Sequence, residues 1–465
     1  MSELKQVTQP LEPEVDDPVK AAAELLPSGA TELTIPEALD LAVRMLRQDR
    51  LDGARTIFER VLQAVPEHPD ALSMLGLLEH RIGRTDVGLP LMRRAVELLP
   101  DFVGFQVNLG NVLIEAGREE EALQALQRAA ELAPQSADIQ NNLGAVHRVM
   151  GDGNQAKACF LHALQLDPQH PRAWNNIGLL LDAVGDAEGA IRAYLSAMKV
   201  TPENSHSAFL LGTAYARLNQ LERAAMVFRE WMVRDPDNPQ PRHMLAAVTG
   251  QNVPERASDA FVETEFDGFA ASFERVLNER LAYRAPALCA ELLGQCLGAP
   301  AQALVLLDAG CGTGLCGPLV APWARELVGV DLSGGMLQRA RGKGCYTRLI
   351  KAELTAFLQN HPSAWDAIVC ADTLCYFGDL QAVMQAAAQA LRPGAVMVYT
   401  VEALPDDGAD SAALQVHGRY AHGRAHIDRV TAAAGLQLVQ ARRDVLRNEG
   451  GQPVNGWLVA VRRSS

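Results

Sequence analysis

Prolines recur every 34 residues in the N-terminal half of this chain, and this period is the feature that most restricts its fold. They stand at Pro66, Pro100, Pro134, Pro168, Pro202 and Pro236. A glycine preceded by Leu or Ile keeps the same phase, at Gly76, Gly110, Gly144, Gly178 and Gly212. A period of this length is typical of a unit of two short helices, which buries its apolar face only by stacking on the next unit. The pattern therefore predicts an all-α solenoid.

The second helix of each predicted unit carries matching small and large positions. The small positions are Ala122, Ala156, Ala190 and Ala224. Four residues after each stands a large one, namely Leu126, Phe160, Tyr194 and Phe228. This register resembles tetratricopeptide (TPR) repeats. The resemblance implies about six units within residues 31–250, with an atypical first unit over 36–66 and a capping helix at 241–248.

Asparagines occupy equivalent positions in successive repeats. Asn108, Asn142 and Asn176 are 34 residues apart, and Asn141 and Asn175 stand beside the last two. An amide offers both a donor and an acceptor, so a ladder of amides on the concave face can hydrogen-bond the backbone of an extended peptide. TPR superhelices with asparagine ladders resemble this pattern. The alternative is that the amides solvate the groove and bond to neighbouring helices, and both interpretations stay open.

A glycine-rich segment in the C-terminal half predicts a nucleotide-like cofactor. Residues 305–314 read Val-Leu-Leu-Asp-Ala-Gly-Cys-Gly-Thr-Gly, and a second apolar run, 327–330, ends on Asp331. Glycines after a buried strand let the backbone pass close to a ligand. A carboxylate at the end of the second strand can accept both ribose hydroxyls. Gly312, Gly314 and Gly317 also satisfy the dinucleotide spacing G-x-G-x-x-G, which is a weak signal on its own.

Asp308 distinguishes between a dinucleotide and other nucleotide-like cofactors that fit a glycine loop followed by an acidic residue. Its position two residues before Gly310 completes D-x-G-x-G-x-G, which resembles the first motif of class I S-adenosylmethionine (SAM) dependent methyltransferases. The resemblance implies SAM as cofactor and, over residues 301–465, an α/β Rossmann-like domain with a mostly parallel seven-stranded sheet. The cofactor-binding residues that it implies are Asp308, Gly310, Cys311, Gly312, Gly314, Asp331, Leu332, Met336, Ala352, Glu353 and Asp372.

The resemblance extends on both sides of this motif. Strand-like runs at 346–350, 365–372 and 395–400 follow in the order of the same fold, although most members carry Asp where Glu353 stands. Residues 251–300 are expected to form a linker and lid helices, with Phe266, Phe269 and Tyr283 folding over the pocket or serving as core. Residues 36–462 together resemble a bacterial group of predicted methyltransferases with N-terminal TPR repeats.

The acceptor side of the site is less well defined. After the fourth strand, Asp372-Thr373-Leu374-Cys375 lacks the Asn/Asp-Pro-Pro-aromatic signature of enzymes that methylate base or amide nitrogens, so those acceptors are disfavoured. Methyl transfer depends mainly on positioning, and a general base is needed only for a protonated acceptor. No catalytic residue is assigned. The candidates are Tyr376, Arg419 and His422, although packing or a surface role would explain the last two equally well.

Composition restricts the remaining functions. The net charge of the 465 residues is −14 and the pI is about 5.3, whereas general nucleic-acid binding needs a basic face. No run of eighteen apolar residues and no hydrophobic start is present, so we expect a cytoplasmic protein that does not bind a membrane. The eight cysteines lack zinc spacing, so no metal is expected. Residues 1–30 are expected to form a mobile acidic arm.

Two functions of different classes fit these patterns. In the first, the protein is a SAM-dependent methyltransferase whose TPR solenoid recruits a protein or carrier-bound substrate. In the second, the repeats form a protein-interaction scaffold and the SAM-binding domain has lost catalysis. The intact Asp308, glycine loop and Asp331 favour the first. An NAD-dependent oxidoreductase is disfavoured by Asp308 and by the lack of a hydride-transfer constellation.

Overall fold

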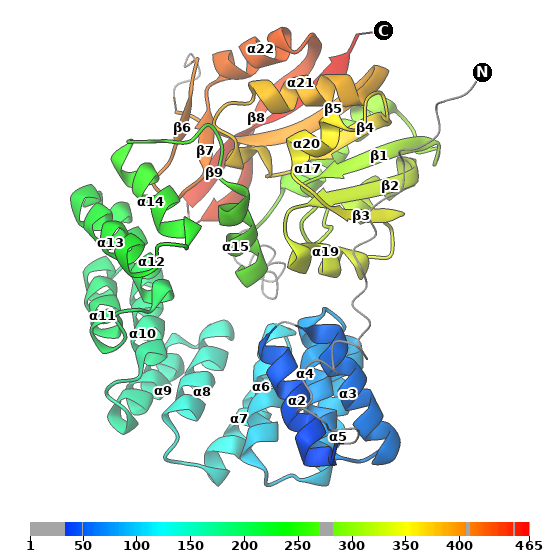
Figure 1. Ribbon diagram of the computed structural model, residues 1–465. Coiled ribbons are helices and arrows are strands. Elements are labelled where there is room, and N and C mark those ends of the chain that lie inside the picture. The colour runs from blue at the N-terminus through cyan, green and yellow to red at the C-terminus, as the bar shows by residue number, and fades with distance from the viewer. Residues whose placement is uncertain (1–32, 49, 270–281, 406–409, 450–451, 465) are drawn as a thin grey trace. The chain divides into compact units, whose positions relative to one another are not determined.

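The protein is divided by its internal contacts into two compact units, Met1–Pro134 and Gln135–Ser465 (Figure 1). The computed structural model describes residues 33–48, 50–269, 282–405, 410–449 and 452–464. The expected acidic arm at 1–30 therefore lies outside the described residues.

Helix pairs build the first unit and the beginning of the second. The first unit contains α2 (Ile35–Arg47), α3 (Leu51–Ala64), α4 (Pro69–Arg81), α5 (Thr85–Leu98), α6 (Val103–Glu115) and α7 (Glu119–Leu132). The second begins with α8 (Ala137–Val149), α9 (Gly153–Leu166), α10 (Pro171–Ala183), α11 (Ala187–Val200), α12 (Ser205–Arg217), α13 (Leu221–Arg234) and α14 (Pro239–Thr249). The predicted helical repeats are thus confirmed, with α14 following the sixth pair.

The repeating glycines are the points where the two helices of a pair meet. A Cβ atom on Gly144 would lie 2.5 Å from the ring of Phe160, and one on Gly178 would overlap the ring of Tyr194. Both rings are fully buried. The large residue of the second helix therefore fills the space that glycine leaves on the first, as the sequence period predicts.

A mostly parallel sheet follows the repeats. Its strands are β1 (Leu304–Ala309), β2 (Ala324–Asp331), β3 (Arg348–Lys351), β4 (Trp365–Cys370), β5 (Leu391–Ala403), β6 (Ala412–Leu414), β7 (Tyr420–His422), β8 (Leu436–Glu449) and β9 (Gln452–Arg463). Strands β3, β2, β1, β4 and β5 are parallel neighbours in that order. Strand β9 pairs antiparallel with β5, and β8 pairs antiparallel with β9.

These seven strands agree with the predicted sheet, and a short hairpin adds to it. Strand β7 pairs in parallel with the end of β5, and β6 pairs antiparallel with β7. The hairpin comes from the segment after β5 that contains the candidate residues Arg419 and His422. Strands β1 and β4 are buried along nearly their whole length, as expected for parallel strands covered on both faces.

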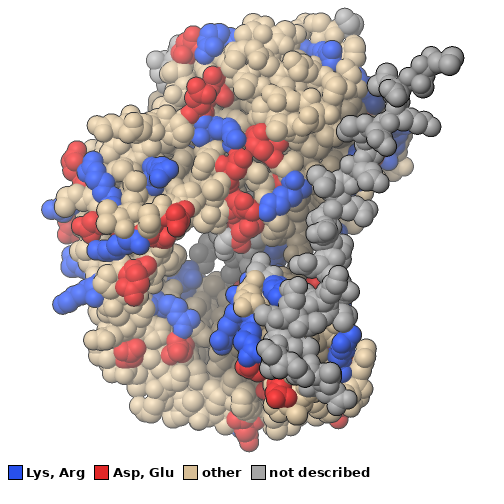
Figure 2. Space-filling model, viewed as in Figure 1, with Lys and Arg blue, Asp and Glu red and all other residues tan. Residues whose placement is uncertain are grey.

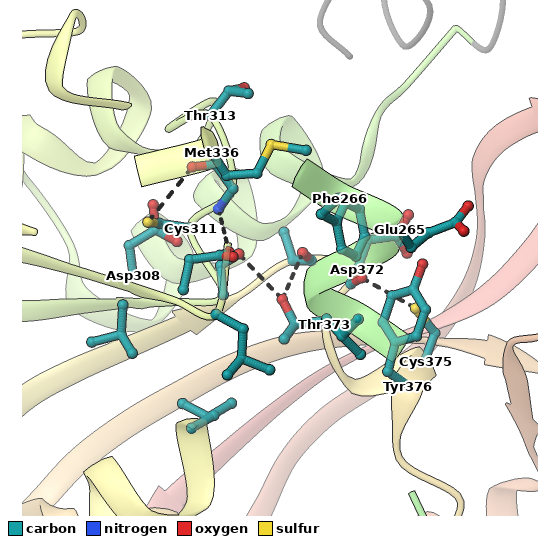
Figure 3. Close-up of a pocket in the computed structure, with 18 of the residues that line it drawn as sticks. Glu265, Phe266, Asp308, Cys311, Thr313, Met336, Asp372, Thr373, Cys375 and Tyr376 are labelled. Atoms are coloured by element: carbon teal, nitrogen blue, oxygen red, sulfur yellow. Dashed lines mark hydrogen bonds between the residues drawn. The ribbon is translucent and has the colours of Figure 1, made fainter. Parts of the chain in front are cut away.

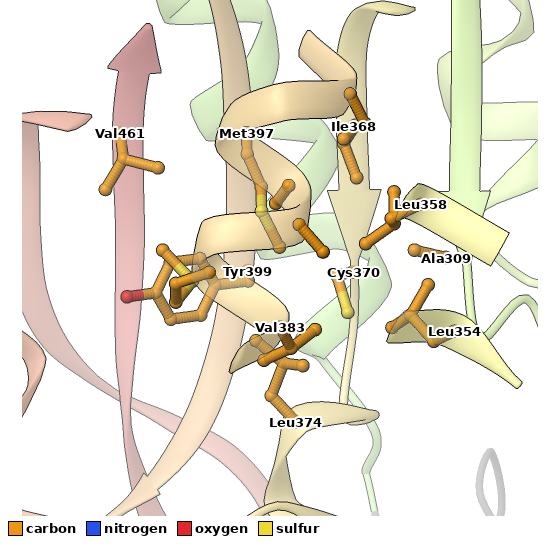
Figure 4. Close-up of a cluster of buried hydrophobic side chains, with 14 of the residues drawn as sticks. Ala309, Leu354, Leu358, Ile368, Cys370, Leu374, Val383, Met397, Tyr399 and Val461 are labelled. Atoms are coloured by element: carbon orange, nitrogen blue, oxygen red, sulfur yellow. The ribbon is translucent and has the colours of Figure 1, made fainter. Parts of the chain in front are cut away.

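Helices cover the sheet on two faces. On one face, residues such as Leu307 and Ile368 pack in one cluster with α20 (Leu354–Gln359), α21 (Gln381–Ala390) and α22 (Arg424–Ala433), and Figure 4 shows part of this core. On the other face, Leu306 and Val398 pack with α17 (Ala285–Leu297) and α18 (Gly317–Val320). Neighbouring residues of β1 therefore pack against helices on opposite faces of the sheet.

Helix α15 (Asp259–Phe269) follows the repeats, and α19 (Gly334–Arg341) follows β2. The two helices contact each other. Residues 285–297, expected in the linker and lid segment, form α17 and belong to the cover of the sheet. None of the helices within the described ranges is both long enough and apolar enough to cross a bilayer.

Candidate functional site

The glycine loop after β1 forms the floor of a pocket at the carboxyl ends of the parallel strands. Gly310, Gly312 and Gly314 all have positive φ angles, of 72°, 53° and 84°. A Cβ atom on Gly310 would overlap the hydroxyl of Thr373, which donates to the carbonyl oxygen of Ala309 at 3.2 Å. Glycine is therefore required here both for conformation and for the close approach of the segment after β4.

Asp331, at the end of β2, holds the loop and the next helix in place. Its Oδ2 accepts from the backbone N–H of Gly312 at 2.8 Å, and its Oδ1 accepts from the N–H of Ser333 at 2.9 Å. Burial raises the pKa of this carboxyl group, and the backbone donors oppose that shift. Each carboxylate oxygen can accept a second hydrogen bond, so both remain able to receive a ligand hydroxyl.

Asp308 is the most deeply buried carboxyl group of the pocket. Its side chain is 1% exposed, and its Oδ2 accepts from the hydroxyl of Tyr346 at 2.6 Å. Among the described residues, its Oδ1 has no hydrogen-bond partner. Burial raises the pKa of Asp308 to about 7, with the Tyr346 hydrogen bond opposing and the charge of Asp331 adding. A buried acceptor without a partner is costly, so this oxygen suits a ligand that brings a donor or a positive charge.

The pocket has a volume of about 220 Å³. Helix α15 covers one side of it and is called its roof. Val262, Glu265 and Phe266 of this helix line it. The rings of Phe266 and Tyr376 lie close together (Figure 3), in an edge-to-face arrangement with their centroids 5.5 Å apart. Tyr283 also lines the pocket, whereas the side chain of Phe269 lies outside the described residues. Two of the three expected lid residues are thus at the pocket.

Contacts to the start of α19 and to β3 hold α15 over the pocket. Asp267 accepts from the Ser333 hydroxyl and, at 3.2 Å, from the N–H of Gly335 in the first turn of α19. Glu263 forms an ion pair with Lys351 of β3. A carboxylate at the N-terminus of a helix is stabilised by the helix dipole. Neither contact follows from sequence spacing, because the partners are more than sixty residues apart.

A buried charge network closes the other end of the pocket. Arg447 of β8 is 3% exposed and donates to Asp372, Glu402 and Glu449. Arg419 donates to Glu402 at 2.6 Å and to both carboxylate oxygens of Glu449. Burial alone would raise the pKa of Glu449, but Arg419 and then Arg447 outweigh it and lower that pKa to about 2. Burial likewise opposes Arg419 and Arg447 at Glu402, whose pKa is lowered, so Glu402 and Glu449 are ionised and paired, whereas burial raises the pKa of Asp372.

Comparison with known proteins agrees with this geometry. A family model described as a methyltransferase domain matches residues 280–442. Models of tetratricopeptide repeats match residues 39–101, 110–151, 137–170, 159–192 and 177–239. The chain therefore contains tetratricopeptide repeats in its N-terminal half and a methyltransferase domain in its C-terminal part.

Similar curated proteins align with the methyltransferase domain. Human methyltransferase-like protein 27 is 41% identical over 85 residues, which are 18% of this chain and 34% of that protein. The biotin biosynthesis bifunctional protein BioHC of Saccharophagus degradans is 28% identical over 162 residues, 34% of this chain and 26% of that protein. A ubiquinone biosynthesis O-methyltransferase of Pectobacterium carotovorum is 29% identical over 99 residues, 20% of this chain and 41% of that protein. The chain thus spans less than half the length of each.

Among solved structures, a thermophilic TPR protein of Thermus thermophilus is 24% identical. The match covers 39% of this chain and all of that chain, with a TM-score of 0.36. The type IV pilus biogenesis factor PilW is 17% identical, and the match covers 46% of this chain and 99% of that chain with a TM-score of 0.41.

The pocket of the methyltransferase domain brings together most of the residues singled out in the sequence. Its lining includes Asp308, Gly310, Cys311, Gly312, Asp331, Leu332, Met336, Ala352, Glu353, Asp372, Tyr376 and Arg419. Glu353 also caps α20, since its oxygens accept from the N–H groups of Thr355 and Ala356. Gly314 is not in the lining. A Cβ atom there would lie 2.9 Å from the ring of Tyr346, so this glycine serves local packing.

His422 lies apart from the other acceptor candidates. It is fully buried, and its Nε2 is 2.8 Å from the carbonyl oxygen of Phe377. Burial lowers the pKa of His422 to about 4, so the ring is neutral. It does not line the pocket, because its place in β7 directs it into the protein interior. Arg447 and Glu449, which sequence reasoning missed, line the pocket instead; only the pairing of β8 with β9 brings them there.

The asparagines of the TPR repeats lie on the first helices of their repeats. Asn141 and Asn175 are buried, and the amide of Asn175 donates to the hydroxyl of Ser207 at 2.9 Å. The side-chain amide of Asn176 donates to the side-chain Oδ1 of Asn141 at 2.9 Å. Asn108 and Asn142 are partly buried. Part of the ladder therefore bonds to neighbouring helices, which does not prevent the remaining donors and acceptors from meeting a peptide.

Proposed function

We propose that this protein is a SAM-dependent methyltransferase whose TPR region recruits a protein or carrier-bound acceptor. The observation that carries the proposal is Asp308, a buried carboxylate with one oxygen left without a partner among the described residues, beside a glycine loop and Asp331. A cofactor with an amino group at one end and ribose hydroxyls at the other matches these groups. Similarity to a probable S-adenosylmethionine-dependent methyltransferase of Saccharomyces cerevisiae, 25% identical over 159 residues, supports the same cofactor.

The residues of the pocket would divide the binding of SAM among them. Asp308 and the glycine loop would hold the methionine part, and Asp331 the ribose hydroxyls. Leu332 and Met336 would lie against the adenine ring. When bound, SAM supplies an activated methyl group on a sulfonium, so the protein needs little covalent chemistry of its own.

The protein must then position the acceptor and exclude water. Phe266 and Tyr376 provide an apolar roof and wall. Tyr376 and Arg419 are the candidates for acceptor contact, because both line the pocket at the side of the charge network. Asp372 also has one buried oxygen without a partner among the described residues, which suits a hydrogen bond from an acceptor hydroxyl or amine.

The TPR region would supply the acceptor as part of a larger partner. Asn108, Asn141, Asn142, Asn175 and Asn176 are the proposed partner-binding residues. On the face shown in Figure 2, basic and acidic side chains are interspersed. This mixture and the net charge of −14 fit a protein or peptide partner better than a nucleic acid. We further propose a cytoplasmic location, which the eight unpaired cysteines fit.

Calorimetric titration with SAM, S-adenosylhomocysteine (SAH) and NAD tests the cofactor assignment. We expect the first two to bind with micromolar affinity and NAD to give no heat of binding. If none of the three binds, the catalytic proposal fails and a scaffold function takes its place. If NAD alone binds, the glycine loop belongs to an oxidoreductase.

A further inference from the structure

Helix α14 ends the TPR helices and also contacts the walls of the pocket. His243 of this helix occupies the position that Asn141 and Asn175 hold in earlier repeats. It is 5% exposed, and its Nε2 is 2.8 Å from the carbonyl oxygen of Gly418. Its ring stacks on Phe261 with centroids 3.9 Å apart. One side chain of the last repeat helix thus contacts two segments of the methyltransferase domain.

Both of these segments carry pocket residues. Phe261 belongs to α15, which supplies Val262, Glu265 and Phe266 to the roof. Gln240, also in α14, donates to Glu265 at 2.8 Å. The roof helix is therefore held from the repeat side as well as from the side of Asp267.

The second segment is the turn that presents Arg419. The N–H of Gln415 donates to the carbonyl oxygen of Arg419, and the N–H of Gly418 donates to that of Gln415, both at 2.8 Å. Gly418 has a φ of 89°, and a Cβ atom on it would lie 3.1 Å from the sulfur of Met244. Val416 packs against the apolar cluster of the last repeats. The turn is therefore fixed against α14 before it reaches the pocket.

We propose that His243 is a positioning residue of the methyl-transfer pocket. Through this residue the last TPR helix sets the places of the α15 roof and of Arg419, so the repeats are part of the pocket's support as well as a means of recruitment. The inference rests on the proposed function. Small displacements at the reacting centre are costly for methyl transfer, because the acceptor must approach in line with the methyl group.

Three substitutions in the full chain separate the two contacts of His243. H243F keeps a ring for stacking and loses the donor to Gly418, whereas H243Q keeps an amide donor and loses the ring. H243A loses both. The matched control is H170A. His170 is another buried histidine of the repeats, whose Nδ1 accepts from the N–H of Ala173 and whose Nε2 is 3.1 Å from Asp138, and it does not line the pocket.

Calorimetry with SAH and hydrogen exchange give the two measurements. We expect H243A to raise the Kd for SAH by about three- to tenfold, which is the range for a lost hydrogen bond. The Kd values of H243F and H243Q should lie between those of H243A and the unaltered protein. H170A should lower the melting temperature and leave that Kd within about twofold. Amide exchange at Gln415 and Gly418 should be faster in H243A than in H170A or the unaltered protein.

The outcomes separate the two proposals. Equal Kd values in H243A and H170A would overturn the role of His243, as would unchanged exchange at Gln415 and Gly418. H243Q or H243F could recover the Kd of the unaltered protein while being as unstable as H170A. That result would support a positioning role for His243 over general destabilisation. If the unaltered protein binds no SAH, the proposed cofactor fails, and the exchange comparison alone decides whether α14 supports the pocket.

Discussion

At the scale of single residues, Asp331 has two tasks in the pocket. It accepts from the N–H groups of Gly312 and Ser333 and is the proposed partner of the ribose hydroxyls. Asp331→Ala should therefore weaken SAM binding by at least tenfold, about 1.5–3 kcal/mol, through the loss of charge-assisted hydrogen bonds. Calorimetry measures the change.

A second aspartate of the same domain provides the control. Asp366 accepts from the N–H of Val305 at 2.8 Å and pairs with Arg392, at the opposite end of β1. Asp366→Ala should lower stability without changing SAM affinity. An unchanged Kd in folded Asp331→Ala would remove the ribose assignment.

Asp308 predicts a pH dependence of cofactor binding. Burial raises its pKa to about 7. Its folded-state pKa lies above the unfolded value, so its contribution to stability is present at low pH and is lost as the pH rises through about 7. A positively charged ligand group favours the ionised form. The Kd for SAM should therefore fall by about tenfold between pH 6 and pH 8.

Asp308→Asn is the variant that isolates this effect, because the amide keeps the shape and cannot ionise. Its Kd should vary less with pH than that of the unaltered protein, and titrations at both pH values compare them. An equal pH dependence in the two proteins would assign the titration to another group.

At the scale of elements, the repeats depend on contact between a glycine and an aromatic ring. Gly178→Ala would place a Cβ atom inside the ring position of Tyr194, so we expect a loss of about 1–3 kcal/mol of unfolding free energy. Gly153→Ala at the start of α9 meets open space and should be neutral or stabilising by up to about 1 kcal/mol. Urea denaturation of both variants checks this. Equal changes in the unfolding free energy of the two variants would mean that the contact with the Tyr194 ring does not cause the loss.

Features that depend on local motifs could be predicted from the sequence. Features that depend on the pairing of distant strands could not. Asp308 and Asp331 follow adjacent strands and carry a fixed spacing to glycines, so sequence alone indicates their place. Arg447 reaches the pocket because β8 pairs with β9 in a register that shifts between Val445 and Arg447. Nothing in the residues around Arg447 encodes that register. His422 was a candidate because of its neighbour Arg419, but the pairing of β7 with β5 buries it elsewhere.

At the scale of the whole molecule, the asparagine positions test whether the repeats recruit the acceptor. Replacing Asn108, Asn142 and Asn176 by alanine should abolish partner capture in a pull-down with the full chain. Because Asn176 donates to the buried Asn141, the variant should also lose about 1–2 kcal/mol of stability. Asn176→Ala alone is the control for that loss. Capture that survives in the folded triple variant would show that the amides serve only the repeats.

The strand order of the sheet has a consequence for synthesis on the ribosome. Strand β9 lies between β5 and β8, although it follows both in sequence. Helix pairs can form as soon as each emerges, because every pair is contiguous in the chain. The sheet cannot close until β9 has left the exit tunnel, and Arg447 has no fixed place before that. A nascent chain should therefore carry folded repeats while its cofactor pocket is still incomplete, leaving the edge of β5 exposed to aggregation during that interval.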